Sequence, residues 1–196
     1  AFFVESIGNP ICQVPDLAAI AAIATRHHVP LIVDNTFASP WLMRPIEHGA
    51  DIVVHSATKF IGGHGTSIGG VIIDAGRFDY AADDRFPLLT EPDPGYHGLR
   101  YARDIGAAAY ITRARVSLLR DTGAAMSPFN AWLFLQGLET LPLRVARHVT
   151  NTEAVTAWLQ AHPAVAWVRY PGLPDDPNYA TARKYLPRGA GSGLSG

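Results

Sequence analysis

One lysine, Lys59, stands out because it is the only Asp, Glu, Lys or Arg between Asp51 and Asp74, and five glycines follow it by residue 70. A lysine taken at random is most often a solvated surface residue. A lone ammonium in an apolar, glycine-rich stretch is instead expected to be partly buried. Burial disfavours the charged form, and the neutral amine is the form that attacks an aldehyde to give a Schiff base. The pattern therefore predicts that Lys59 is a covalent catalyst.

Polar side chains near this lysine suggest what it could work with. Ser56 and Thr58 lie within three residues of Lys59 and follow an apolar run, where hydroxyls and backbone N–H groups suit a phosphate. The alternative is that both only satisfy turn backbone groups. Asp34 ends the apolar run 31–33, and open α/β sheets bind ligands at the carboxyl ends of their strands. A carboxylate there can pair with a protonated ring nitrogen; the alternative is a turn or helix cap.

Two other chemistries fit the sequence poorly. A phosphate-binding P-loop needs its glycines before the Lys-Ser/Thr pair, whereas here Lys59 precedes Gly62 and Gly63, and no G-x-G-x-x-G follows the first apolar run. The eight histidines form no H-E-x-x-H pattern, and the adjacent His27 and His28 cannot easily serve one metal. We predict no metal site. The single cysteine, Cys12, is read as a small buried apolar residue.

Composition narrows the class of protein. The chain has 196 residues, of which 48% are hydrophobic and 17% charged, so it can bury a core. A net charge of -1 gives no electrostatic basis for binding nucleic acid or an anionic membrane, and no apolar run is long enough to span a bilayer. We therefore expect a small-molecule substrate. One cysteine excludes a disulfide within the chain and fits a reducing, cytoplasmic compartment.

The elements that must position these residues alternate along the first half of the chain. Hydrophobic patterns and turn residues predict strands over 2–5, 31–33, 51–55, 68–73 and 165–168, and helices over 16–28, 101–119, from Ser127-Pro128, 141–161 and 179–186. Strand, helix and strand within residues 2–33 form a βαβ unit, which implies parallel pairing. The expected fold class is α/β, with a mostly parallel sheet flanked by helices. We place a domain boundary near Thr140, giving parts 1–140 and 141–196.

Two long strings carry a resemblance to a known family. They are Val33-Asp34-Asn35-Thr36-Phe37-Ala38-Ser39-Pro40 and, from Glu47 to Gly65, a string that contains His55-Ser56-Ala57-Thr58-Lys59-Phe60-Ile61-Gly62-Gly63-His64-Gly65. Together they resemble the lysine motif of the Cys/Met-metabolism family of pyridoxal-phosphate (PLP) enzymes. The resemblance extends over nearly the whole chain. Residues 91–98 and 127–141 look most like the O-acetylhomoserine sulfhydrylase branch of that family.

The resemblance implies roles for five residues. Lys59 would hold PLP as a Schiff base and later move protons, and Asp34 would pair with the pyridine nitrogen. Ser56 and Thr58 would bind the phosphate, and Asn9 would hydrogen-bond the ring hydroxyl oxygen. The implied fold is the type I PLP fold, like that of aspartate aminotransferase. Residues 1–140 would then be the C-terminal part of the large domain, and 141–196 the linking helix and the start of a smaller α/β domain.

The implied reaction is γ-replacement on O-acetyl-L-homoserine, in which sulfide or methanethiol displaces acetate to give homocysteine or methionine. The alternatives within the family are cystathionine γ-synthase and a γ- or β-lyase acting on cystathionine or methionine. Family members are usually homotetramers, dimers of dimers. Both ends of the chain look cut, and the family's glycine-containing phosphate loop, ring-stacking tyrosine and carboxylate-binding arginine find no match here. A further alternative is therefore a fragment that is inactive on its own.

Overall fold

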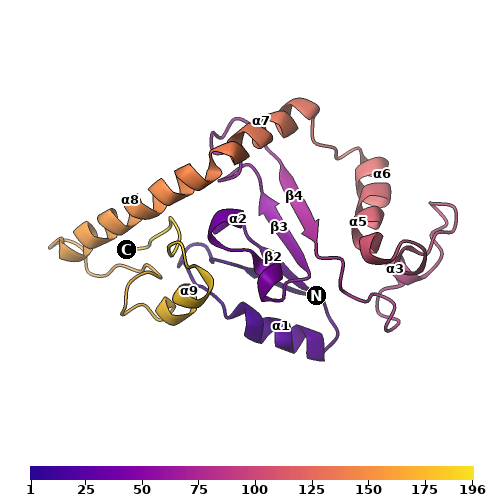
Figure 1. The fold of residues 1–196 in the computed structure, drawn as a ribbon, viewed down its shortest axis with the longest axis horizontal. Coiled ribbons are helices and arrows are strands. Elements are labelled where there is room, and N and C mark those ends of the chain that lie inside the picture. The colour runs from indigo at the N-terminus through magenta and orange to yellow at the C-terminus, as the bar shows by residue number, and fades with distance from the viewer. The chain divides into compact units, whose positions relative to one another are not determined.

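The computed structural model describes residues 1–196 and contains one sheet of four short strands in the order β1-β2-β3-β4 (Figure 1). The strands are β1 (Phe2–Glu5), β2 (Leu31–Asp34), β3 (Ile52–Ser56) and β4 (Gly70–Asp74). β1, β2 and β3 pair in parallel, with Val4 opposite Val33 and Val33 opposite Val53. β4 runs in the opposite direction at the edge of the sheet. The predicted mostly parallel sheet is confirmed.

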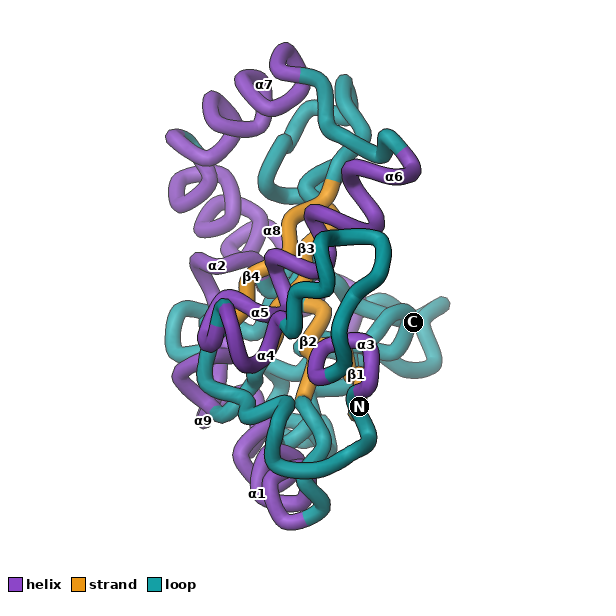
Figure 2. Tube along the Cα trace, turned by 90° about the vertical axis from the view of Figure 1, so that its right-hand side faces the viewer, coloured by secondary structure: helices purple, strands orange, loops and turns teal.

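Helical segments make the crossovers between the parallel strands. Helix α1 (Leu17–Arg26) connects β1 to β2, as predicted, and the Asp16 side chain caps it by accepting from the backbone N of Ala19 at 3.1 Å. The short α2 (Ser39–Leu42) and a 3-10 turn (Pro45–His48) connect β2 to β3. Figure 2 shows that helices and loops make up most of the chain around these short strands.

The chain folds as two compact units, residues 1–72 with 128–196, and residues 73–127. The first unit holds the larger core, in which apolar residues of the sheet and α1 pack with residues of the C-terminal helices; its buried members include Leu17, Leu31, Val33, Val53, Leu141, Val145, Val149 and Tyr185. The C-terminal helices are α7 (Pro128–Glu139), α8 (Leu141–Ala161) and α9 (Tyr179–Tyr185). Figure 1 shows α7 and α8 following each other along nearly one line.

The second unit, residues 73–127, has its own small core of Tyr80, Leu89, Tyr101 and Ala109. Its helical segments are short: α3 (Pro87–Thr90), α4 (Tyr101–Asp104), a 3-10 turn (Gly106–Ala108), α5 (Ala109–Arg113), a π-helical turn (Ala114–Leu119) and α6 (Arg120–Thr122). The single helix predicted over 101–119 is therefore interrupted. The break lies at Gly106, whose φ of +69° is not helical.

One predicted strand is wrong. Residues 165–168 form no strand, and the chain there makes only an isolated antiparallel bridge between Arg169 and Ser195. The segment has the apolar residues of a strand, but a strand also needs a neighbouring strand to pair with along its length. Residues 165–168 have no such neighbour. The proposed boundary near Thr140 remains a prediction. No helix is long and apolar enough to cross a membrane.

Candidate active site

The ends of two neighbouring strands bring polar side chains together. β2 ends at Asp34 and β3 ends at Ser56, and because the two strands are parallel these ends lie at the same edge of the sheet. Thr36 links them through two hydrogen bonds. Its backbone N donates to Asp34 Oδ1 at 2.9 Å, and its Oγ1 accepts from the backbone N of Ser56 at 2.8 Å. These two hydrogen bonds therefore hold the Asp34 carboxylate in a fixed position relative to Ser56, where the turn that carries Lys59 begins.

A cavity of about 220 Å³ opens at this edge of the sheet. Four of the five predicted site residues line it, namely Lys59, Asp34, Ser56 and Asn9. The remaining lining residues are Glu5, Ile7, Thr36 and Phe37. An amine, a carboxylate and a hydroxyl thus face one small space, as expected from strands that end side by side.

Lys59 lies on a tight turn that follows β3. Its backbone N donates to the carbonyl O of Ser56 at 3.2 Å, its own carbonyl O accepts from Gly63 N at 2.8 Å, and Gly62 N donates to the Ala57 carbonyl O at 2.8 Å. The prediction that Lys59 is partly buried is wrong for this chain, because its side chain is exposed. The apolar and glycine residues around Lys59 bury the backbone of the turn and leave the lysine side chain exposed. Lys59 nevertheless lines the cavity.

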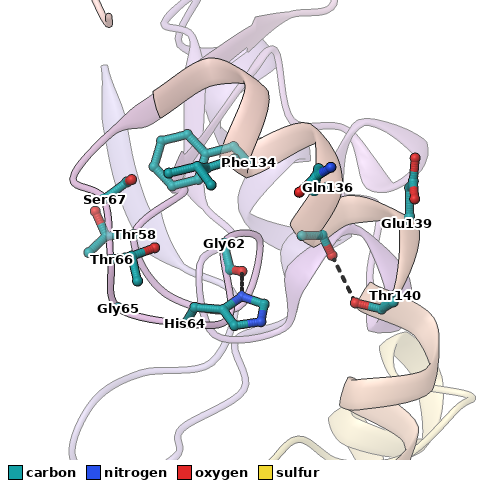
Figure 3. Close-up of a pocket in the computed structure, with 12 residues that line it drawn as sticks. Thr58, Gly62, His64, Gly65, Thr66, Ser67, Phe134, Gln136, Glu139 and Thr140 are labelled. Atoms are coloured by element: carbon teal, nitrogen blue, oxygen red, sulfur yellow. Dashed lines mark hydrogen bonds between the residues drawn. The ribbon is translucent and has the colours of Figure 1, made fainter. Parts of the chain in front are cut away.

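Thr58 is the predicted site residue that does not line this cavity. It borders a different cavity of about 500 Å³, between residues 62–67 and α7 (Figure 3). Its Oγ1 donates to the Gly69 carbonyl O at 3.3 Å and accepts from Gly69 N at 3.1 Å. These bonds connect the turn after β3 to the residue before β4. Its predicted role as a phosphate ligand stays a prediction.

The charges around the site come from few groups. Lys59 supplies the cation on the cavity, and Asp34 and Glu5 supply the carboxylates. His55, buried in β3 at 4% exposure, has its pKa lowered by burial, an effect that the nearby Asp34 charge opposes. The lowered pKa favours the neutral form of this imidazole. Cys12 is a buried, free thiol, as predicted, and no group of three or more His, Cys, Asp or Glu is arranged to hold a metal ion.

Sequence reasoning missed two residues that organise the site. Thr36 belongs to the string around Asp34, and a hydroxyl two residues beyond a strand-end carboxylate was a signal that could have identified it. Arg144 was missed for a different reason. It lies 85 residues after Lys59, yet together with Asn9, Phe37 and Lys59 it lines a neighbouring cavity of about 480 Å³. No local pattern in the sequence connects the two.

Comparison with known proteins identifies the family. Residues 1–195 match the family described as "Cys/Met metabolism PLP-dependent enzyme". The chain belongs to this family. Its members depend on PLP, so the predicted cofactor class is confirmed for the family to which this chain belongs.

Individual members resemble the chain closely. An O-acetyl-L-homoserine sulfhydrylase of Leptospira meyeri is 54% identical over 197 residues, which cover 96% of this chain and 44% of that protein. A homocysteine synthase of Schizosaccharomyces pombe is 53% identical over 197 residues, 100% of this chain and 46% of that protein. The chain therefore spans less than half the length of these relatives.

A solved structure supports the fold of this Cys/Met-metabolism chain. The crystal structure of a putative O-acetylhomoserine (thiol)-lyase from Campylobacter jejuni, which contains N'-pyridoxyl-lysine-5'-monophosphate, superimposes with a TM-score of 0.91. The two sequences are 38% identical, and the match covers 97% of this chain and 47% of the Campylobacter chain. The predicted type I PLP fold is confirmed.

Proposed function

We propose that this protein catalyses γ-replacement on O-acetyl-L-homoserine, with sulfide or methanethiol displacing acetate to give homocysteine or methionine. The observation that carries the proposal is the cavity that Lys59, Asp34 and Ser56 line together. The relatives called O-acetyl-L-homoserine sulfhydrylase and homocysteine synthase support this choice of substrate. Because the chain spans less than half of those relatives, we assign the activity to the full-length protein and expect residues 1–196 alone to be inactive.

The side chains at the cavity fit PLP. The cofactor has an aldehyde, a pyridine nitrogen, a ring hydroxyl and a phosphate, and the cavity presents an amine, a carboxylate, an amide and a hydroxyl within about 220 Å³. We assign covalent attachment to Lys59 and the ring nitrogen to Asp34. Ser56 would hold the phosphate, and Asn9 would hydrogen-bond the ring hydroxyl oxygen. Thr58 lies outside this cavity, and we propose it as a second phosphate ligand.

The chemistry divides between cofactor and protein. When bound, PLP supplies an electron sink for negative charge that develops at the substrate Cα. The Asp34 carboxylate would keep the ring nitrogen protonated, which would maintain that sink. The Lys59 amine would accept the proton from Cα, release that proton so that the amine is neutral again, and then accept one from Cβ, after which acetate could leave Cγ. Its exposed position on a hydrogen-bonded turn suits an amine that must exchange partners during each turnover.

The reaction type is tested by assaying the full-length protein with two substrate sets. We expect homocysteine from O-acetyl-L-homoserine plus sulfide, and no appreciable keto acid from methionine or cystathionine. Keto acid release from either amino acid in preference to homocysteine formation would instead identify a lyase. Cystathionine formation with cysteine as the nucleophile, at a higher kcat/KM than with sulfide, would identify a cystathionine γ-synthase.

Assembly, location and domain organisation are further parts of the proposal. We infer a homotetramer built from two dimers, which the exposed apolar side chains of α7 support: Phe129, Trp132 and Leu135 are 64%, 50% and 62% exposed. Light scattering of the full-length protein should give the mass of four subunits.

The single free cysteine supports a reducing, cytoplasmic location. We also propose that the large domain ends near residue 140 and that α8 links it to the smaller one.

A further inference from the structure

Arg144 of α8 is hydrogen-bonded to the backbone of the turn that carries Lys59. Its Nη1 donates to the Phe60 carbonyl O at 2.8 Å, and its Nη2 donates to the Ile61 carbonyl O at 3.3 Å. Nη2 also donates to the Gly137 carbonyl O at 2.7 Å. One guanidinium therefore joins the two residues after Lys59 to the C-terminal end of α7.

The guanidinium is also bonded at the start of its own helix, where its Nε donates to Thr140 Oγ1 at 3.1 Å. The Thr140 hydroxyl in turn donates to the Gly137 carbonyl O at 3.5 Å (Figure 3). Burial lowers the pKa of Arg144, and its four partners are carbonyl and hydroxyl oxygens, none of them a carboxylate. A partly buried cation that binds neutral oxygens gains its stabilisation from well-aligned bonds. The fork geometry of arginine matters here as well as its charge.

Close packing around the guanidinium leaves little room for the turn to move. A Cβ at Gly63, whose φ is +75°, would lie 2.3 Å from Arg144 Nη1. A Cβ at Gly62 would lie 3.0 Å from the Phe134 ring of α7, and one at Gly137 would lie 2.3 Å from the Ile61 carbonyl O. Glycine at 137 thus lets α7 meet the backbone of residues 61 and 62, and glycines at 62 and 63 leave room for the Phe134 ring and the Arg144 guanidinium.

A second contact from α8 lies one helical turn further on. The His148 ring packs edge-on against the Phe60 ring, with centroids 5.9 Å apart. Phe60 in turn meets Phe37 edge-on at 6.0 Å, and Phe37 lines the cavity with Lys59. Helix α8 therefore contacts Phe60 twice, by the carbonyl through Arg144 and by the ring through His148. Both the backbone and the ring of Phe60, the residue next to Lys59, are therefore in contact with α8.

We propose that Arg144 is a positioning residue for Lys59: it ties the carbonyls of Phe60 and Ile61 to the junction of α7 and α8, and so sets where the lysine amine can reach. This rests on the proposed function only in taking Lys59 as the cofactor lysine. Arg144 itself does not touch the reacting atoms. Its effect is transmitted through the backbone of residues 59–63.

The first test measures amide hydrogen exchange in the full-length protein without cofactor. In Arg144→Met we expect peptides containing Gly62 and Gly63, which donate to the Ala57 and Lys59 carbonyls, to exchange about tenfold faster than in the parent, because a charged hydrogen bond is lost. Arg147→Met is the matched control, since Arg147 is exposed on the same helix, and its exchange in this segment should be unchanged. Unchanged exchange in Arg144→Met would overturn the proposal.

The second test measures how fast added PLP becomes covalently bound to the cofactor-free protein. We expect Arg144→Met to bind it about tenfold more slowly and Arg144→Lys to fall between, with melting temperatures of Arg144→Lys and the parent close together. Millimolar guanidinium chloride should restore the attachment rate of an Arg144→Ala variant and leave Arg147→Ala unaffected. Parent-like attachment in all Arg144 variants would contradict the proposal. Attachment that survives Lys59→Ala would refute the proposed function instead, while the exchange result would still test the anchoring of the turn.

Discussion

Replacing Gly137 with alanine tests how closely α7 packs on the lysine turn. Gly137 is buried in α7, and in an ordinary helix interior a Gly-to-Ala change stabilises by about 1 kcal/mol. Here the added Cβ would lie 2.3 Å from the Ile61 carbonyl O and 2.6 Å from the Gly62 carbonyl O. Both are backbone atoms, which cannot rotate away, so the helix or the turn must shift.

The overlap should exceed the gain in helix propensity. Overpacking of this kind costs about 1–3 kcal/mol, and the shift also stretches the 2.7 Å bond from Arg144 to the Gly137 carbonyl. Set against a propensity gain of about 1 kcal/mol, overpacking alone leaves a net loss of up to about 2 kcal/mol, and the stretched bond to Arg144 adds to that loss. Urea unfolding of the full-length protein, followed by far-ultraviolet circular dichroism, should give a lower midpoint for Gly137→Ala than for the parent.

A neighbouring substitution supplies the control. Gln136 is exposed in the same helix, so Gln136→Ala should change the unfolding free energy by less than about 0.5 kcal/mol. If Gly137→Ala proved as stable as the parent, or more stable by the usual helix-propensity gain, then α7 would not rest on the carbonyls of residues 61 and 62. The argument for the anchored lysine turn would fail with it.

Three further predictions follow from single contacts. Thr36→Val should lower the free energy of unfolding by about 1–3 kcal/mol, because it leaves the Ser56 N–H without its hydrogen-bond acceptor, whereas Thr36→Ser should retain most of the stability. Thermal unfolding compares the two variants, and equal losses would show that the Thr36 hydroxyl does not make this hydrogen bond. Hydrogen bonds from Tyr185, the Ala19 backbone and Lys184 lower the Asp16 pKa to about 2. The stability that the Asp16 carboxylate contributes is therefore present above about pH 4 and is lost as the pH falls towards about 2. Asp16→Asn should reduce this loss of stability in acid, and the same dependence of unfolding on pH in the variant and the parent would refute the prediction. Asp34→Asn should lower kcat by a factor of about 10²–10³, whereas Asp51→Asn, at the other end of the strands, should have little effect on kcat. Steady-state assays of both variants test this prediction, and equal activity of Asp34→Asn and the parent would contradict the proposed pairing of Asp34 with the ring nitrogen.

Local sequence patterns predicted the elements that carry the site. The apolar runs 31–33 and 51–55, followed by Asp34 and Ser56, were sufficient to place a carboxylate and a hydroxyl at one sheet edge, because parallel strands end together. Asp16 as a helix cap and Pro128 as a helix start follow from equally local chemistry.

What the sequence could not predict depends on contacts between distant segments. The exposure of Lys59 is set by which side of the turn packs against α7, and the interaction of Arg144 with Phe60 joins residues 84 positions apart. The predicted strand over 165–168 failed for the same reason, since pairing depends on a partner that its own residues do not specify. Apolar residues in a segment indicate that it can be buried as a strand, but they do not indicate which strand it will pair with.

The central claim is that Lys59 holds the cofactor, and the two lysines of this chain allow a direct test. Lys59 and Lys184 are the only lysines among the 196 residues, and Lys184 is paired with Asp16 at 3.1 Å and does not line the cavity. Borohydride reduction of the PLP-loaded full-length protein, followed by peptide mass spectrometry, should find the pyridoxyl phosphate group on Lys59. Lys184→Ala should leave that adduct in place. An adduct on any other lysine, with Lys59 unmodified, would contradict the account.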